Sequence, residues 1–283
     1  MVQIITDSTC DLEKSMLEEF DIAVIPLSVN LDGRQFWDGI HLTLDELYRL
    51  VHKSGALPKT AAPTPGEFIA LFNKFPEDIV FIGISSNASA TVQNARLAAV
   101  DLPQKNIQVV DSLNLTTGLG IQAMEAAELA RKGFSAKEIA EHIKIFRTRI
   151  HTAFIVDTME YLYMGGRCSA LQNVMSSLLK IRPLIYMQPN GSLGVKKKIR
   201  GSRAKALQGL LDDVREDAAL IDTRRIFITY NRCEEDADFI KQEILKILPA
   251  KEVHLTITGT VVASHCGPKT ISIQYALRDM EQK

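Results

Sequence analysis

The sequence predicts an α/β protein of two domains, in which an N-terminal, mostly parallel sheet with helices on both faces precedes a C-terminal α/β domain with a mixed sheet. Through the first 150 residues, short β-branched runs alternate with segments of helical periodicity, a pattern typical of parallel strands covered by helices. The second half adds a hairpin signal and a terminal strand, which favour a mixed sheet. The length of 283 residues fits two domains, which we expect at residues 1–150 and 151–283, since domains average roughly 150 residues.

In the first half, brief apolar runs bounded by polar turns predict strands, and the segments between them predict helices. The expected strands are Val2–Ile5, Ala23–Val29, Ile79–Ile84 and Ile107–Val110, with a turn signal at Asp32-Gly33 after the second. The expected helices are Leu12–Phe20, Thr43–His52, Pro65–Phe75, Thr91–Val100 and Leu119–Arg131.

The second half follows a long amphipathic helix at Ser135–Arg149, which Ser135 and Glu138 can begin as a capping box. Further helices are expected at Ala170–Lys180, Ser202–Asp217 and Glu234–Leu248. Strands are expected at Phe154–Val156, Arg225–Tyr230, Val253–Thr258 and Ile271–Ala276, with a hairpin around Asn190-Gly191.

Charge and hydropathy exclude several classes of protein. Lys plus Arg number 33 and Asp plus Glu number 34, a formal charge of −1, so bulk electrostatics cannot drive binding to nucleic acid. No apolar run approaches the roughly 18 residues of a membrane-spanning helix, and no signal-peptide pattern is seen. Cys10, Cys168, Cys233 and Cys266 form no CxxC pair, so we expect reduced thiols and no metal site. These features indicate a cytoplasmic protein without an integral membrane segment.

Three loops place small polar residues where parallel strands end and helices begin. They are Thr6–Thr9, which holds Asp7 and Ser8, Ser85–Thr91, which holds Ser89, and Asp111–Gly118, which holds Ser112. Open α/β sheets bind ligands at this edge, and helix N-terminal N–H groups favour an anion. Ordinary N-capping explains the same residues, so both interpretations stay open.

A fourth segment, Lys59–Pro65, contains two prolines that predict an extended turn leading into a helix. Thr64 and Glu67 form a second capping-box pattern. Capping does not explain Thr60, which becomes a candidate binding residue.

The second half offers three basic features. Arg167 follows the Gly165-Gly166 pair and can bind a carboxylate or phosphate, or form a surface salt bridge. His265 stands in a small-residue turn at Gly259–Pro268, where a lone histidine is usually structural. The basic cluster of Lys196, Lys197, Lys198, Arg200, Arg203 and Lys205 is either a solvated face or a surface for an acidic partner or phosphorylated ligand.

Taken together, these segments resemble the DegV family, bacterial fatty-acid-binding proteins that act as substrate subunits of fatty acid kinase. The resemblance rests on Thr6–Leu12, Thr60–Pro65, Ser85–Thr91, Asp111-Ser112, Gly165–Arg167, Arg182–Leu184 and His265–Pro268. It implies a two-domain DegV-like fold that holds one long-chain fatty acid in an apolar tunnel, with the carboxylate near the domain junction. The bound fatty acid is then the only ligand, without a further cofactor.

The resemblance also implies roles for individual residues. Thr60, Ser89 and His265 match the carboxylate ligands, and Arg167 matches an arginine linked to phosphate transfer. Further supporting residues are expected among Asp7, Ser8, Ala61, Thr91, Ser112 and Lys269. The partner kinase phosphorylates the carboxylate to an acyl phosphate that feeds phospholipid synthesis, so the protein itself is not an enzyme and has no catalytic residues. Transient contact with a membrane surface is compatible with that role.

Two positions depart from the family pattern. Ala61-Ala62 stands where the family commonly has Ser-Gln, which removes a hydroxyl whose hydrogen bond to a charged group contributes about 1.5–3 kcal/mol. Lys269 stands where the family usually has a glycine and adds a positive charge near His265.

Two alternatives remain. A hydrolase or phosphotransferase acting on an acyl or phosphate substrate could use Ser89 with His265, oriented by Asp7 or Asp111, although the sequence has no GxSxG-type motif. A sensor could instead present its bound state to a partner that docks on the Lys196–Lys205 cluster.

Overall fold

The computed structural model describes residues 1–166, 181–250 and 252–279. They form two compact units: Met1–Thr148 with Gly259–Ser264, and Arg149–Thr258 with His265–Lys283. The return of Gly259–Ser264 to the first unit has no counterpart in the sequence prediction.

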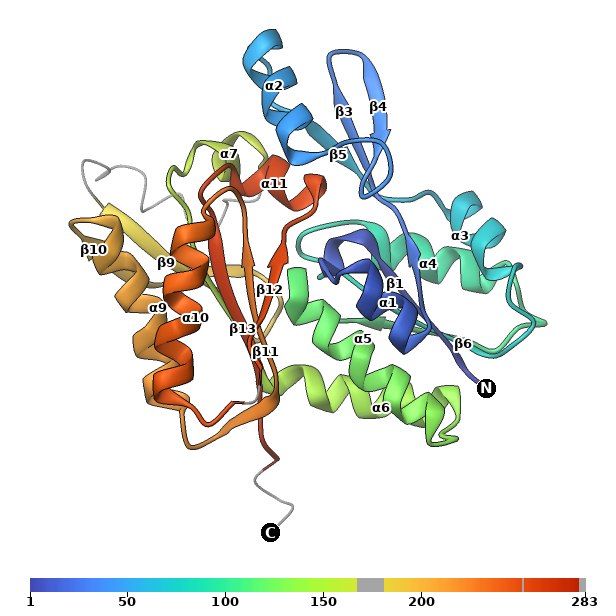
Figure 1. Cartoon of the computed structure of the whole chain (residues 1–283). Coiled ribbons are helices and arrows are strands. Elements are labelled where there is room, and N and C mark those ends of the chain that lie inside the picture. The colour runs from blue at the N-terminus through green and yellow to red at the C-terminus, as the bar shows by residue number, and fades with distance from the viewer. Residues whose placement is uncertain (167–180, 251, 280–283) are drawn as a thin grey trace. The chain divides into compact units, whose positions relative to one another are not determined.

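The first unit contains a parallel sheet of four strands in the order β2-β1-β6-β7. Its strands are β1 (Gln3–Asp7), β2 (Ile22–Ile25), β6 (Ile79–Gly83) and β7 (Ile107–Asp111). On one face, α3 (Pro65–Phe72) and α4 (Thr91–Val100) bury a core around Phe68, Phe72 and Phe81. On the other face lie α5 (Thr116–Arg131) and α6 (Ala136–Phe146), while α1 (Lys14–Phe20) packs on β2 and α5 (Figure 1). The predicted parallel sheet is confirmed.

A second, antiparallel sheet in this unit corrects one strand prediction. The segment expected as the single strand Ala23–Val29 forms β2 in the parallel sheet and then β3 (Ser28–Leu31) in another sheet. Pro26 separates them, because proline has no N–H to donate to a ladder. The small sheet has the order β4-β3-β5, with β4 (Arg34–Trp37) and β5 (Lys59–Ala61), and α2 (Leu44–Ser54) lies between these strands in the chain.

The turn signal between β3 and β4 is confirmed. Asp32 and Gly33 both have positive φ, 52° and 73°, which is the backbone that a type I′ hairpin turn needs. Residues 59–61, expected as part of an extended turn, pair with β3 instead.

The second unit contains a six-stranded mixed sheet in the order β10-β9-β8-β13-β11-β12, in which only β11 and β12 are parallel. The strands are β8 (Ile150–Ile155), β9 (Ile181–Met187), β10 (Leu193–Arg200), β11 (Ile221–Tyr230), β12 (His254–Ile257) and β13 (Ile271–Leu277). The core lies between this sheet and α9 (Arg203–Asp217) and α10 (Glu234–Ile247), around Leu210, Ile240 and Tyr275 (Figure 1). The predicted mixed sheet and its Asn190-Gly191 hairpin are confirmed, with Gly191 at φ 82°.

The described part of the second half also contains the short helices α7 (Glu160–Met164) and α11 (Thr260–Cys266). The expectation of a turn over Gly259–Pro268 is wrong, because most of that segment is helical. The predicted helix Ala170–Lys180 lies outside the described residues. The helix expected to reach Arg149 ends at Phe146 and continues as a 3₁₀ turn, Arg147–Arg149. In the described part of the chain, no helix is both long and apolar enough to cross a membrane.

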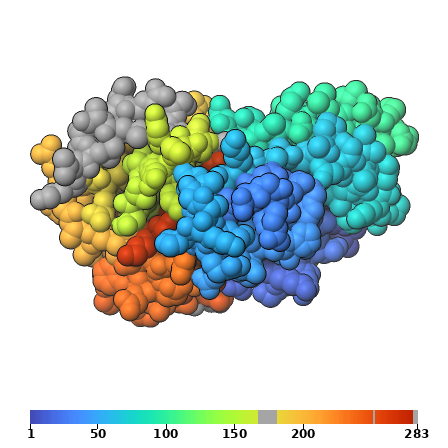
Figure 2. Space-filling view, turned by 90° about the horizontal axis from the view of Figure 1, so that it is seen from above, coloured from blue at the N-terminus to red at the C-terminus, as the bar shows by residue number. Residues whose placement is uncertain are grey.

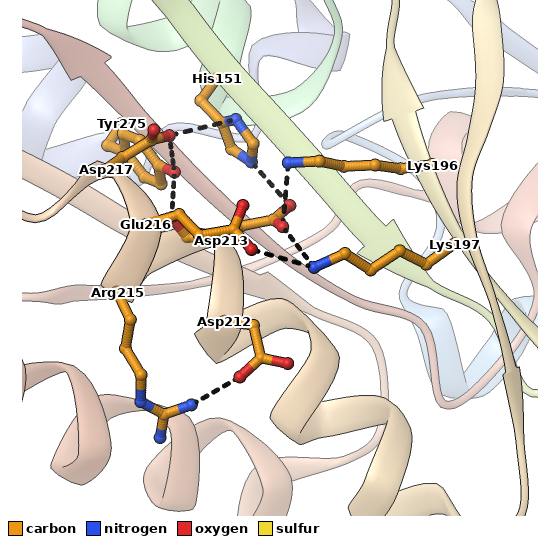
Figure 3. Close-up of polar contacts among 9 residues, drawn as sticks. All are labelled: His151, Lys196, Lys197, Asp212, Asp213, Arg215, Glu216, Asp217 and Tyr275. Carbon is orange, nitrogen blue, oxygen red and sulfur yellow. Dashed lines mark hydrogen bonds and ion pairs between the residues drawn. The ribbon is translucent and has the colours of Figure 1, made fainter.

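A buried carboxylate joins α9 to the neighbouring strands. Asp213 on α9 is 1% exposed, and its oxygens lie 2.9 Å from Lys196 Nζ, 3.5 Å from Lys197 Nζ and 3.4 Å from His151 Nε2 (Figure 3). Burial alone would raise the pKa of Asp213, but the hydrogen bonds and charges of His151 and Lys196 outweigh it and hold that pKa below its ordinary value.

Local geometry lets two consecutive lysines reach this carboxylate. The pairing of β10 with β9 shifts register between Val195 and Lys197, and such a bulge turns neighbouring side chains toward the same side. His151 stacks on Tyr275 with 4.6 Å between ring centroids, and the Tyr275 hydroxyl donates to Asp217 at 2.7 Å (Figure 3).

A second buried carboxylate joins the ends of two parallel strands. Asp7 at the end of β1 is fully buried, and it accepts hydrogen bonds from the Thr9 N–H at 3.0 Å, from the Thr9 hydroxyl and from the Ile84 N–H at 2.7 Å. Burial exceeds the effect of these bonds and raises the pKa of Asp7 to about 6. Asp7 therefore has a structural role in closing the β1 and β6 loops.

Asp213→Ala should lower the free energy of unfolding at neutral pH by about 2–3 kcal/mol, because Lys196, Lys197 and His151 lose their shared counter-charge. Asp212→Ala is the matched control: Asp212 is 50% exposed, and its one ion pair among the described residues is with Arg215 on the same helix, a contact that contributes about 0.5 kcal/mol or less. Urea denaturation of both variants measures the difference, and equal losses would contradict the role of Asp213.

Asp7→Asn should change the pH dependence of stability. The folded-state pKa of about 6 exceeds the reference value of 3.8, so the native state holds this proton more tightly than the unfolded state. Wild-type stability should therefore fall relative to the variant by ~3 kcal/mol as pH rises from about 4 to 6.5, and then level off. Denaturant unfolding at a series of pH values measures it, and a difference independent of pH would contradict the raised pKa.

Candidate functional site

The loops after β6 and β7 are joined by hydrogen bonds at the carboxyl edge of the parallel sheet. The Ser85 N–H donates to Asn114 O at 2.9 Å, and the Ser112 N–H donates to Gly83 O at 3.1 Å. The Asp111 carboxylate accepts from the N–H groups of Ser86 at 3.3 Å and Leu113 at 3.0 Å. These loops therefore form one connected edge.

Ser89 lies two residues before Thr91, the first residue of α4. Their hydroxyl oxygens are 2.8 Å apart, and Ser89 Oγ accepts from the Thr91 N–H at 3.3 Å. Thr91 is fully buried, whereas Ser89 is half-buried. Thr91 thus orients the Ser89 hydroxyl, and Ser89 combines a capping contact with a partly accessible surface.

Two other predicted supporting residues bond within the fold. Ser112 is fully buried, and its hydroxyl donates to Asn114 O and accepts from the Asn114 N–H, both at 3.1 Å. The Ser8 hydroxyl accepts from the Leu27 N–H at 3.1 Å. With Asp7, they favour the loop-closing interpretation of these positions over direct ligand binding.

Thr60 is the central residue of β5, where it pairs with Val29 of β3 and is half-buried, and the adjacent Ala61 is exposed. The predicted capping box is confirmed, because Thr64 and Glu67 bond reciprocally at the start of α3. This segment also contacts the helix that begins near Ser89, since the Asn94 amide of α4 donates to Pro63 O at 2.8 Å. The first unit thus joins the Thr60 segment to α4.

His265 lies in the last turn of α11 and is half-buried. A Cβ on Gly165, at the end of α7, would overlap His265 Nδ1, so only glycine permits this close approach. Gly267 has φ +76°, and a Cβ there would lie 2.6 Å from the Tyr161 ring. The first glycine of the Gly165-Gly166 pair therefore serves packing against the imidazole.

Lys269 is exposed and has φ 58°, a backbone conformation that glycine adopts at lower cost. Its N–H donates to Asn231 O at 2.7 Å. Arg167 lies outside the described residues.

The basic cluster is partly neutralised by its own unit. Asp213 pairs with Lys196 and Lys197, and Arg203 pairs with Asp236 at 2.5 Å and with Asp157 at 3.8 Å. Within the described ranges, Lys198, Arg200 and Lys205 form no salt bridge and are exposed. If a partner docks on this cluster, these three side chains are the ones that remain available to it.

Each unit contains a pocket among its described residues. In the first unit a pocket of about 320 Å³ is lined chiefly by apolar residues, among them Trp37, Ile40 and Leu71. In the second a pocket of about 380 Å³ lies beside α7 and includes Met159 and Met164. Thr60, Ser89 and His265 line neither pocket. In the part of the chain that the structure describes, no group of three or more His, Cys, Asp or Glu side chains could hold a metal ion.

Sequence reasoning missed the carboxylates at the start of α11. Asp38 Oδ1 accepts from the Thr260 N–H at 2.7 Å, the Thr260 hydroxyl at 2.8 Å and the Val261 N–H at 3.3 Å, and Asp11 Oδ1 accepts from the Gly259 N–H at 2.8 Å. Burial raises the pKa of Asp38. Asp38 and Thr260 are 222 positions apart in the sequence, so no local pattern could predict this cap.

Known proteins are similar to this chain over nearly its whole length. The family model described as "Uncharacterised protein, DegV family" matches residues 1–278. A DegV domain-containing protein of Clostridium perfringens is 31% identical over 277 residues, which are 97% of this chain and 98% of the relative.

Solved structures are similar to the same extent. A DegV family protein of Thermus thermophilus, described by its fatty acid binding, has a TM-score of 0.90 and 29% identity over 98% of this chain and 99% of its own. DegV of Bacillus subtilis, described as a fatty acid binding protein, has a TM-score of 0.88 at 29% identity and the same coverage. The match of the family model, together with the likeness in sequence and fold, shows that the chain belongs to the DegV family.

Proposed function

We propose that this protein binds a long-chain fatty acid and presents its carboxylate to the catalytic subunit of a fatty acid kinase. The observation that carries the first part is the similarity, over 98% of the chain, to family members described as binding fatty acids. The acyl chain supplies the affinity, because each buried methylene contributes about 0.8 kcal/mol and roughly a dozen give ~10 kcal/mol before the costs of association.

Thr60, Ser89 and His265 bind the carboxylate in this proposal. A carboxylate removed from water needs hydrogen-bond donors or a cation, and two hydroxyls with an imidazole N–H supply donors. The Ser89–Thr91 pair supports this role: when Thr91 donates to Ser89, the Ser89 proton is free for the ligand, and each bond strengthens the other. Ala61 has no hydroxyl, so these three residues carry the head-group contacts.

The kinase part of the proposal rests on exposed positive charge. Lys198, Arg200 and Lys205 are the cluster members without a salt bridge in the described residues, and such a group attracts an acidic partner surface. We assign Arg167 to the phosphate-transfer step that yields the acyl phosphate for phospholipid synthesis. The segment that contains α7 is yellow-green in Figure 2. On this helix Tyr163 and Met164 are 53% and 64% exposed, and exposed aromatic and apolar side chains suit transient contact with a membrane surface.

The alternative of a Ser89–His265 hydrolase gains no specific support. Asp7 accepts hydrogen bonds from Thr9 and Ile84, and Asp111 accepts them from Ser86 and Leu113. Both carboxylates proposed to orient His265 are thus engaged with their own loops.

Native mass spectrometry of the protein purified from cells should show an added mass in the fatty-acid range, and lipid extraction should release the acid. With the kinase catalytic subunit and ATP, the loaded protein should yield acyl phosphate. Thr60→Val, Ser89→Ala and His265→Ala should each weaken fatty-acid binding roughly tenfold, whereas Ser54→Ala, at an exposed hydroxyl bonded to its own helix end, should not. An apo mass together with no binding of added fatty acids would overturn the proposal, and turnover of acyl esters abolished by Ser89→Ala would favour the hydrolase.

Gly165→Ala should weaken fatty-acid binding roughly tenfold, because its Cβ would displace the His265 imidazole. Gly66→Ala is the matched control, since a Cβ at Gly66 on α3 meets nothing within 4 Å. Calorimetric titration with a fatty acid measures both variants. Unchanged affinity in Gly165→Ala would show that His265 does not need this position to bind the ligand.

A further inference from the structure

Helix α11 begins at side chains that lie far from it in the sequence. Its first turn donates three hydrogen bonds to a single oxygen of Asp38, and the preceding Gly259 N–H donates to Asp11. Asp38 itself is 3% exposed. The initial N–H groups of a helix have no partner within the helix, and here these two carboxylates supply the acceptors.

The composition of α11 makes it dependent on that contact. The helix has seven residues and starts with Thr260, Val261 and Val262, all β-branched and poor helix formers. Isolated helices of this length do not persist in water. An N-terminal carboxylate satisfies the first N–H groups and also interacts favourably with the helix dipole.

Close packing at Gly259 shows how near the carboxylates approach. A Cβ on Gly259 would lie 3.0 Å from both carboxylate oxygens of Asp38 and 3.2 Å from Asp11 Oδ1. A serine or threonine cap would meet the same need through one hydroxyl oxygen without burying a charge. The burial of Asp38 raises its pKa, and the hydrogen bonds from Thr260, Ser8 and Val261 offset that effect only in part.

The other end of the same helix carries His265, five residues after Thr260. At a rise of about 1.5 Å per residue, the imidazole is only a turn and a half of helix away from the first turn, so a shift of that turn changes the position of the imidazole. On one side the imidazole already lies so close to Gly165 that a Cβ there would overlap Nδ1, so a shift toward Gly165 is blocked.

We propose that Asp38 is a positioning residue for the carboxylate of the fatty acid: by holding the first turn of α11 it sets the place of His265, without touching the ligand. The expected effect on fatty-acid binding rests on the proposed function. The placement of His265 does not, because it can be measured without any ligand.

The test compares Asp38→Ala, Asp38→Asn and a matched control, Thr43→Ala. Thr43 is the N-cap of α2, with a full capping box. Its substitution removes a helix cap in the same unit, but from a helix that contains no residue proposed to bind the fatty acid. Each variant is measured by urea unfolding, by the ring NMR signals of ¹⁵N-labelled His265 in the ligand-free protein, and by titration with a fatty acid.

Asp38→Ala should shift the His265 ring signals and weaken fatty-acid binding roughly tenfold. Asp38→Asn should restore both, because its amide oxygen can still accept from the Thr260 and Val261 N–H groups. Thr43→Ala should lower stability without moving either readout. If Asp38→Ala does not fold, Thr260→Val, which removes only the hydroxyl donor, should give the same shifts at smaller size.

Unchanged His265 signals in Asp38→Ala, or in Thr260→Val where that variant takes its place, would overturn the positioning role, as would an equal effect of Thr43→Ala. Wild-type protein that binds no fatty acid, while Asp38→Ala still moves the His265 signals, would contradict the proposed function and leave the positioning of His265 supported. Wild-type binding with an unaffected Asp38→Ala variant would support the proposed function and reject the inference.

Discussion

The first unit depends on hydrogen bonds that backbone N–H groups donate to buried aspartates. Asp7 accepts from the N–H groups of Thr9 and Ile84, and Asp111 accepts from those of Ser86 and Leu113. Asp38 and Asp11 do the same for the start of α11. Buried N–H groups in loops cost free energy unless they find acceptors, so these carboxylates define how the strand ends and helix starts are held.

The buried aspartates differ in chemistry and exposure from the residues proposed to bind the ligand. The four carboxylates are at most 8% exposed and face their own backbone. The residues proposed to bind the fatty-acid carboxylate are two hydroxyls and an imidazole, all half-buried. Hydroxyl and imidazole N–H donors can bind an anion without the repulsion that a nearby free carboxylate would introduce.

In the second unit a buried carboxylate has a different role, because it pairs with side chains rather than with backbone N–H groups. Asp213 neutralises two adjacent lysines that a bulge in β10 brings to one side. Lys198, Arg200 and Lys205 remain exposed outside such pairs. The net charge of −1 therefore does not show how the basic residues are used. Some members of the basic cluster stabilise the fold, and others remain available to a partner.

The sequence by itself determined the α/β class, the parallel and mixed sheets, most helices and the capping boxes at Thr64 and Ser135, because periodicity and capping are local. It also indicated the loop with Ser89, the unusual Thr60 and the conspicuous His265. Only the tertiary structure decided that Pro26 divides a predicted strand between two sheets, that Lys196 and Lys197 are paired, and that Gly165 packs on His265. It also decided that α11 is a helix at all, because its β-branched first turn is capped by an aspartate 222 residues away, and no local pattern can encode a partner that only folding brings near.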